Sequence, residues 1–124
     1  MTRFSGRKVL VLEDEAMVSL LIEDLLLDLG CEVLGPCMRI SEANRILDSG
    51  ATPDLALLDV NVAGERSFPL AERLSRANVA ILFVTGYDSA GMEPRWRDHP
   101  ALRKPFTHVD FESMVTKLLA GGTA

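Results

Sequence analysis

Short runs of aliphatic residues alternate along the chain with longer stretches in which apolar positions recur every three or four residues. The runs are typical of strands buried on both faces of a sheet, and the three-and-four spacing is typical of amphipathic helices. Strands are predicted at 8–12, 31–34, 55–61, 79–84 and 101–103. Helices are predicted at 16–29, at 41–48, from the turn that contains Pro69, and after Thr107 as far as Leu118.

The first helix carries more apolar surface than one stripe needs. Its inward stripe is predicted at Val18, Leu21, Ile22, Leu25 and Leu29. Three more apolar residues lie beside that stripe: Met17, Leu20 and Leu27. They indicate either deeper burial of the helix or a face for a partner, and burial is the more ordinary explanation.

Turn-forming and capping residues mark the boundaries of these elements. Gly35-Pro36 is expected to close the second strand, Ser41 to cap the second helix, and 62–66 to form a loop. Thr107, followed three residues later by Asp110, is expected to cap the last helix. The least regular segment is 88–100, where glycine and prolines leave room only for a short, frayed or mobile helix near 89–93.

Strands that alternate with helices build a parallel sheet, because each crossover lays a helix against one face of the sheet. The pattern therefore predicts a three-layer, doubly wound α/β fold around five parallel strands, with four clear helices and a weak one. A chain of 124 residues, 48% of them hydrophobic, has room for one domain with a substantial core and not for two.

Composition excludes several classes of function. A net charge of −5 leaves no basic surface for nucleic acid. The apolar run at 79–84 is too short to span a membrane and the amino terminus lacks a signal-peptide core, so we expect a cytoplasmic protein. Two cysteines, Cys31 and Cys37, are too few and too close in sequence for a disulfide scaffold or a structural zinc site, and we expect them to be buried or half-buried thiols. Met1 and the glycine-rich end favour a complete protein over a piece of a longer one.

Candidate chemistry gathers where the predicted strands end. Glu13 and Asp14 follow the first strand, Asp59 ends the third, Thr85 follows the fourth and Lys104 the fifth. The carboxyl ends of neighbouring parallel strands converge, so these groups are expected to share one shallow cleft. Carboxylates brought so close repel one another and need a cation, and an all-oxygen donor set favours Mg²⁺. Taken singly, each group has an ordinary explanation as a helix cap, a turn residue or a surface lysine; taken together, they predict a site.

The set of motifs resembles the receiver domain of bacterial two-component response regulators from about Lys8 to Leu119. The resemblance rests on Val11-Leu12-Glu13-Asp14-Glu15, Leu57-Leu58-Asp59, Val84-Thr85-Gly86 and Lys104-Pro105-Phe106 in that order. It implies a single receiver domain over 1–124 with a flavodoxin-like strand order 2-1-3-4-5. It also implies that Asp59 is the phosphoacceptor, aided by Thr85 and Lys104, with a cis Lys104-Pro105 peptide. Mg²⁺ would be bound by Asp14, Asp59 and the backbone carbonyl of Asn61, with Glu13 acting through water.

Within the family, Phe83-Val84-Thr85-Gly86-Tyr87 and Gly64-Glu65-Arg66-Ser67-Phe68-Pro69 resemble the FAT-GUY subgroup of alphaproteobacterial single-domain regulators. Val84 replaces that subgroup's usual alanine. Ala101 occupies the position where receivers commonly carry a Tyr or Phe that rotates inward on activation. We hypothesise that 88–100, with Tyr87 at its root, carries the conformational response instead. Tyr87 is equally well explained as an ordinary surface aromatic.

Three functions remain open on these residues. The first is a phosphorylation-switched signalling module, which takes a phosphoryl group from a histidine kinase or histidine phosphotransfer protein and acts through an unknown downstream protein. The second is a phosphatase or phosphotransferase with an aspartyl nucleophile. It is disfavoured because Asn61 stands where such enzymes use a second acid, and the site is expected to have no histidine nearby. The third is an interaction domain of the same fold that is never phosphorylated.

Overall fold

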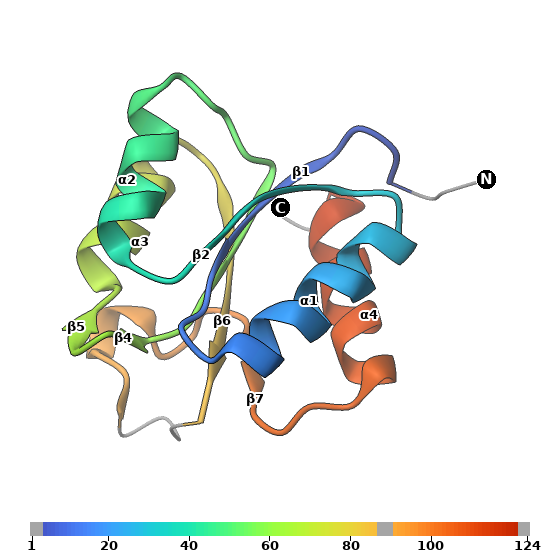
Figure 1. Cartoon of the computed structure of the whole chain (residues 1–124). Helices are drawn as coiled ribbons and strands as arrows, with labels where there is room; N and C mark the ends of the chain where they lie inside the picture. Colours follow the sequence, from blue (N-terminus) through green and yellow to red (C-terminus); the bar gives the residue numbers. More distant parts are fainter. Residues whose placement is uncertain (1–3, 87–90, 122–124) are drawn as a thin grey trace.

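Five parallel strands form a sheet through the middle of the molecule, with helices on both of its faces (Figure 1). The computed structural model describes residues 4–86 and 91–121. The sheet order is β2-β1-β3-β6-β7, which confirms the predicted order and fold class. The strands are β1 (Lys8–Leu12), β2 (Glu32–Cys37), β3 (Leu55–Leu58), β6 (Ala80–Thr85) and β7 (Ala101–Arg103).

The helices divide evenly between the two faces of the sheet. One face is covered by α1 (Ala16–Asp28) and α4 (His108–Leu119), and the other by α2 (Ile40–Asp48) and α3 (Phe68–Arg76) (Figure 1). Along β1, Val9 and Val11 pack into the core under α1 and α4, whereas Leu10 and Leu12 pack into the core on the other face. Successive strand side chains point to opposite faces, so a strand covered on both sides must be apolar at every position. Cys31 and Cys37 are free and buried, as expected.

The exposed side of α1 contradicts the prediction that its extra apolar residues are buried. Met17, Leu20 and Leu27 are 85%, 59% and 52% exposed. Leu21, which was expected to point inward, is also exposed. The predicted inward positions Ile22, Leu25 and Leu29 are buried as expected, and Ser19 and Leu26 join them on the buried face. Only one flank of α1 meets the sheet, and the described residues place no element over the opposite flank.

The second strand was expected to end at Gly35-Pro36, and this expectation is wrong. β2 runs on to Cys37, and the β1–β2 register shifts between Leu10 and Leu12 to accommodate an irregularity at this point. Gly35 has φ +100°, and a Cβ there would lie 2.6 Å from the backbone nitrogen of Cys37. β2 is an edge strand, where proline and an irregular backbone are tolerated.

The expected loop at 62–66 contains a small antiparallel hairpin, β4 (Asn61–Val62) and β5 (Glu65–Arg66). Ala63 and Gly64 connect the two strands with φ of 50° and 84°. Positive φ at both central residues is the geometry that a tight two-residue hairpin turn requires. The hairpin leads directly from Asp59 into α3.

Helix capping agrees with the prediction at α4 and not at α2. The Asp110 backbone N–H donates to Thr107 Oγ1 at 3.0 Å, which confirms the expected cap. α2 begins one residue earlier than expected, so Ser41 lies inside its first turn. There the Glu42 carboxylate accepts a hydrogen bond from the Met38 N–H at 3.0 Å, and the N-cap residue Arg39 forms no side-chain capping bond.

The segment predicted to be least regular is anchored in its described part. Residues 94–96 form a single 3₁₀ turn, η2 (Pro94–Trp96), and no α-helix is present over 91–93. Trp96 is only 2% exposed and packs edge-to-face on Phe83, with ring centroids 5.8 Å apart. Tyr87 and residues 88–90, which the prediction also involved, lie outside the described residues.

Candidate functional site

Backbone hydrogen bonds extend past the strand ends and fix the positions of the candidate residues. The Glu13 N–H donates to Cys37 O at 2.9 Å, the Asp59 N–H to Leu12 O at 3.0 Å and the Lys104 N–H to Thr85 O at 2.8 Å. The sheet ladder therefore continues by one residue after β1, β3 and β7. Because all of these strands are parallel, the side chains that follow them emerge at the same edge of the sheet.

Lys104 is the cationic centre of this edge. Its Nζ lies 2.7 Å from Glu13 Oε1, 2.9 Å from Glu15 Oε1 and 3.1 Å from Asp59 Oδ2. The contacts with Glu15 and Asp59 have the angles of hydrogen bonds, whereas Glu13 Oε1 has no directional hydrogen bond and is held by charge at short range. One ammonium group thus faces three carboxylates that come from two different loops.

Burial and mutual charge shift the proton affinities of this group. Burial alone would lower the pKa of Lys104, but its close contacts with the carboxylates of Glu13, Glu15 and Asp59 outweigh that effect and raise the pKa, so the amine stays protonated. Burial is also the largest influence on Glu13, whose pKa is raised with a further contribution from the Asp59 charge. Lys104 and the Glu15 N–H oppose that rise. The site therefore holds its acids in a cluster that favours an additional cation.

Three of these acids have the geometry of a cation site. Carboxylate oxygens of Glu13, Asp14 and Asp59 all lie within 4.8 Å of one another. Asp14 is oriented by the hairpin, because its Oδ2 accepts a hydrogen bond from the Ala63 N–H at 2.9 Å. Glu13 is 1% exposed and offers a buried oxygen without a directional donor. Hard cations such as Mg²⁺ prefer oxygen ligands and are commonly held by one or two carboxylates, so the residues present fit that ion.

Two further candidate residues, Thr85 and Asn61, lie at the end of β6 and at the start of β4. Thr85 is 3% exposed at the end of β6, and its backbone oxygen accepts the hydrogen bond from Lys104. Asn61 is exposed and begins β4, two residues after Asp59. The Lys104-Pro105 peptide is cis, in agreement with the resemblance described above. Ala101, at the position of the usual aromatic, is exposed and pairs with Phe83.

Sequence reasoning missed two residues beside the site. Glu15 was not among the candidate site residues, yet its side chain makes no helix-capping bond and contacts Lys104. Arg66 donates from Nη1 to the Gly91 carbonyl at 3.0 Å and so connects the hairpin after Asp59 to the segment after β6. Glu15 could have been found from the run of three acids after β1. No pattern in the sequence indicates the Arg66 contact.

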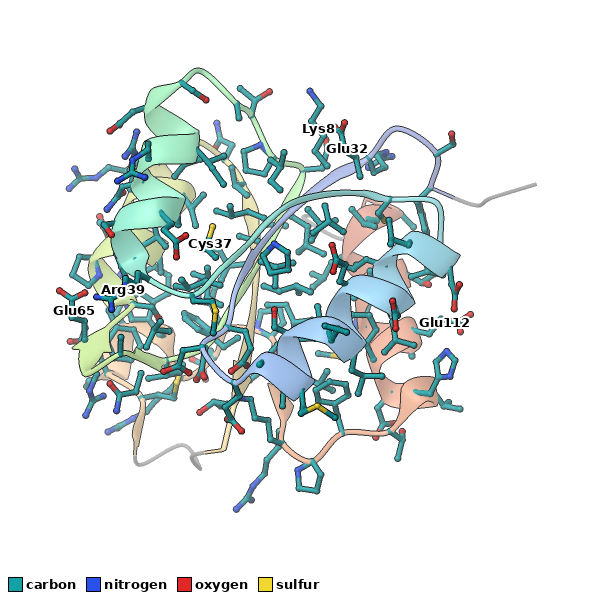
Figure 2. The ribbon with its side chains drawn as sticks, viewed as in Figure 1. Lys8, Glu32, Cys37, Arg39, Glu65 and Glu112 are labelled. Atoms are coloured by element: carbon teal, nitrogen blue, oxygen red, sulfur yellow. The ribbon has the colours of Figure 1, made fainter. Side chains whose placement is uncertain are left out.

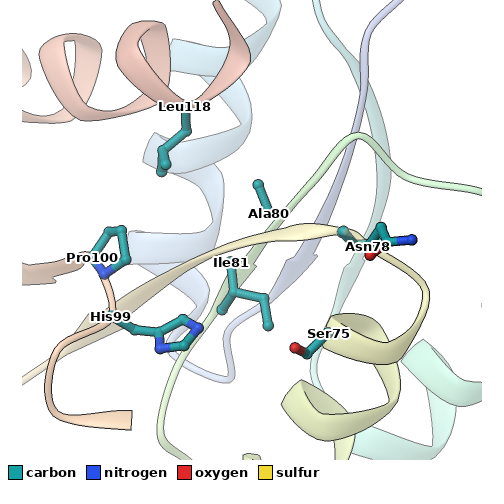
Figure 3. Close-up of a pocket in the computed structure, with 8 residues that line it drawn as sticks. Ser75, Asn78, Ala80, Ile81, His99, Pro100 and Leu118 are labelled. Carbon is teal, nitrogen blue, oxygen red and sulfur yellow. The ribbon is translucent and has the colours of Figure 1, made fainter. Parts of the chain in front are cut away.

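A pocket of about 480 Å³ lies at the other end of β6 (Figure 3). It is lined by Ser75, Asn78, Val79, Ala80, Ile81, His99, Pro100 and Leu118. Val79 and Ala80 precede and begin β6, whereas Thr85 ends it, so the pocket opens at the amino edge of the sheet. Figure 2 shows Lys8 and Glu32, which begin β1 and β2, side by side at that same edge. The pocket therefore contributes nothing to the acidic site.

Comparison with known proteins decides the family. No protein-family model matches the chain. The solution structure of SdrG from Sphingomonas melonis Fr1 superimposes with a TM-score of 0.80 at 32% identity, covering 96% of this chain and 99% of SdrG. The receiver domain of the PhyR response regulator from Erythrobacter litoralis superimposes with a TM-score of 0.83 at 25% identity, covering 94% of this chain and 92% of that one. This chain belongs to the receiver-domain family of response regulators.

The receiver domain also matches longer regulators. PhyR from Methylorubrum extorquens is 27% identical over 116 residues, which make up 90% of this chain and 43% of PhyR. The chain spans about half the length or less of the curated relatives it matches. These relatives agree with the expected resemblance to alphaproteobacterial regulators. Over the described residues of this receiver domain, no helix combines the length and the hydropathy needed to cross a bilayer.

Proposed function

We propose that Asp59 of this receiver domain accepts a phosphoryl group from a phosphohistidine, with Mg²⁺ present, and that the phosphorylated domain signals by binding a downstream protein. A single observation supports this proposal most directly. The Lys104 ammonium group lies 3.1 Å from Asp59 Oδ2 inside a group of acids with cation-site geometry. A carboxylate nucleophile, a fixed cation and a metal-fitting acid pair are together the components that phosphoryl transfer requires.

Each residue has a defined part in the transfer. An Asp59 carboxylate oxygen attacks phosphorus while the bond from phosphorus to the donor nitrogen breaks, and the donor imidazole leaves with the electron pair and takes up a proton. Lys104 offsets the negative charge on the phosphoryl oxygens, and the Thr85 hydroxyl donates a hydrogen bond to one of them. Mg²⁺ held by Asp14, Asp59 and the Asn61 backbone carbonyl, with Glu13 acting through bound water, would supply further positive charge beside those oxygens.

The exposed face of α1 is suited to the phosphodonor. α1 begins at Ala16, immediately after the acids of the site, so its exposed Met17 and Leu20 lie on the helix that borders Asp59. A protein donor must bring its phosphohistidine to Asp59, which is only 6% exposed, and therefore needs a docking surface close to that edge. Exposed apolar residues on one helix provide such a surface for a histidine kinase or a histidine phosphotransfer protein.

An enzymatic function is supported less well. A phosphatase with an aspartyl nucleophile needs a second group for acid-base work, and Asn61 cannot transfer protons. Both histidines lie elsewhere, since His99 lines the pocket at the amino edge and His108 is in α4 beside Glu112. The acidic site itself thus favours a residue that is phosphorylated over an active site that turns over substrate.

Intact-mass measurement after treatment with a small acyl phosphate and Mg²⁺ tests the proposal. We expect the mass of one phosphoryl group on the wild type and none on Asp59→Asn. Asp28→Asn removes an exposed acid of α1 away from the site and serves as the matched control, which must label like the wild type. A wild type that never labels would support an unphosphorylated interaction domain, and sustained release of phosphate from monoesters would support a phosphatase.

A further inference from the structure

Glu15 makes a contact that neither helix capping nor the metal-fitting cluster explains. It occupies the N-cap position of α1 with an extended backbone, and its side chain forms no capping bond. Its Oε1 instead accepts a hydrogen bond from Lys104 Nζ at 2.9 Å, across 89 positions of sequence. The cation-site group consists of Glu13, Asp14 and Asp59 and does not include Glu15.

The three carboxylates around Lys104 differ sharply in their access to water. The Glu13 and Asp59 side chains are 1% and 8% exposed, whereas the Glu15 side chain is 61% exposed. A buried carboxylate that loses its cation loses most of its stabilisation, but an exposed carboxylate exchanges the cation for water at little cost. Glu15 is therefore the partner that Lys104 can release most easily.

An ammonium group has three protons to donate, and here three carboxylates surround it. A phosphoryl group on Asp59 brings new oxygens that also need Lys104. Glu13 and Asp59 are buried and belong to the cation-site group, so the exposed Glu15 is the partner whose place the new oxygens take at the least cost.

We propose that Glu15 is a positioning residue that competes with the phosphoryl group for Lys104 and so weakens phosphoryl binding at this site. The inference rests on the proposed function of Asp59. In the unphosphorylated state, Glu15 holds Lys104 in place and shields its charge. In the phosphorylated state, Glu15 turns into solvent, which gives phosphorylation a readable change at the start of α1.

Binding of beryllofluoride, a phosphoryl mimic that attaches to aspartate, measures this competition without any turnover. The titration uses the full chain at saturating Mg²⁺ and is followed by the backbone amide signals of Thr85 and Lys104 in NMR spectra. Exposed ion pairs contribute little energy, so we expect Glu15→Gln to bind beryllofluoride about two- to fivefold more tightly than the wild type. In the Mg²⁺-free protein, the same change should shift the side-chain amine signal of Lys104.

Two variants separate the contact from a general effect of charge. Glu15→Asp keeps the negative charge but is shorter by one methylene, roughly 1.5 Å, so its carboxylate falls short of Lys104. It should therefore behave like Glu15→Gln. Glu65→Gln removes one exposed acid from the hairpin after Asp59, away from α1, and should bind like the wild type (Figure 2).

The outcomes are distinct. Wild-type affinity in Glu15→Gln, or weaker binding, would overturn the competition. Tighter binding in Glu15→Gln combined with wild-type affinity in Glu15→Asp would show a charge effect and would also overturn it. Failure of the wild type to bind beryllofluoride or to label at Asp59 would instead refute the proposed function, and the role of Glu15 with it.

Discussion

The clearest test of the site's electrostatics is the replacement of Lys104 by methionine, which keeps much of the side chain's volume and removes its charge. Lys104 is 14% exposed and is in contact with Glu13, Glu15 and Asp59. Without it, two nearly buried carboxylates face each other with no cation, while Glu15 simply becomes solvated. The variant should therefore be markedly less stable than the wild type when Mg²⁺ is absent.

The magnitude follows from which contacts are buried. Removing one partner of a buried ion pair costs about 3–5 kcal/mol, and an exposed pair contributes about 0–1 kcal/mol. Because Lys104 retains some exposure, we expect a loss of about 3 kcal/mol, from a total stability on the order of 5–15 kcal/mol for a domain. Mg²⁺ should restore part of the lost unfolding free energy, since it offers the acids another cation and binds only the folded site.

Urea unfolding in chelator and in Mg²⁺, followed by the fluorescence of the buried Trp96, gives the free energy of unfolding for each variant. Lys117→Met removes an exposed lysine of α4 and should change stability by less than about 0.5 kcal/mol. Glu13→Gln combined with Lys104→Met should recover much of the loss, because one of the two unpaired charges is gone. If Lys104→Met unfolds at the wild-type urea concentration in chelator, the ammonium does not hold these acids together and our reasoning fails.

Two further predictions concern pH and docking. Burial lowers the pKa of His99, and the charge of Arg95 lowers it further, whereas the charge of Asp98 opposes both effects. As pH falls below the usual histidine pKa of 6.5, the unfolded chain therefore binds a proton that the folded chain does not. The contribution of His99 to stability should therefore decrease as pH falls through that window, by at most about 1.4 kcal/mol per pH unit. In urea titrations at several pH values, His99→Gln should flatten the dependence of the unfolding free energy on pH, and His108→Gln should leave that dependence unchanged. Equal pH dependence in all three proteins would exclude the effect. Leu20→Glu should slow phosphotransfer from purified, phosphorylated histidine kinases tested as a panel and leave acyl-phosphate labelling unchanged, and a parallel loss in both assays would argue against docking on α1.

Local pattern was enough to predict much of the fold. Every position of β1 from Val9 to Leu12 is buried, and only a strand covered on both faces requires that pattern. Because strands alternate with helices, the strands form a parallel sheet. Because the carboxyl ends of parallel strands lie at one edge, Glu13, Asp59 and Lys104 come together there. This part of the site was predictable because it depends only on where strands end.

Orientation and cross-chain contacts were not predictable in the same way. The apolar residues of α1 are compatible with several inward stripes, and only packing against the sheet selects Ser19 and Leu26 over Leu21. The extension of β2 through Gly35-Pro36 depends on its pairing with β1, and nothing in the sequence of residues 31–37 predicts that pairing.

The sequence by itself determined the five strands of the sheet, the four α-helices and the edge of the sheet that collects the acids and the lysine, because local apolar patterns reveal which segments are buried and how they alternate. Only the tertiary structure decided that Glu15 shares Lys104 with Glu13 and Asp59 and that Arg66 reaches Gly91. These contacts join residues far apart in the chain through side chains a few ångströms long. Their existence depends on strand register and helix rotation, which the whole packed core sets and no single segment encodes.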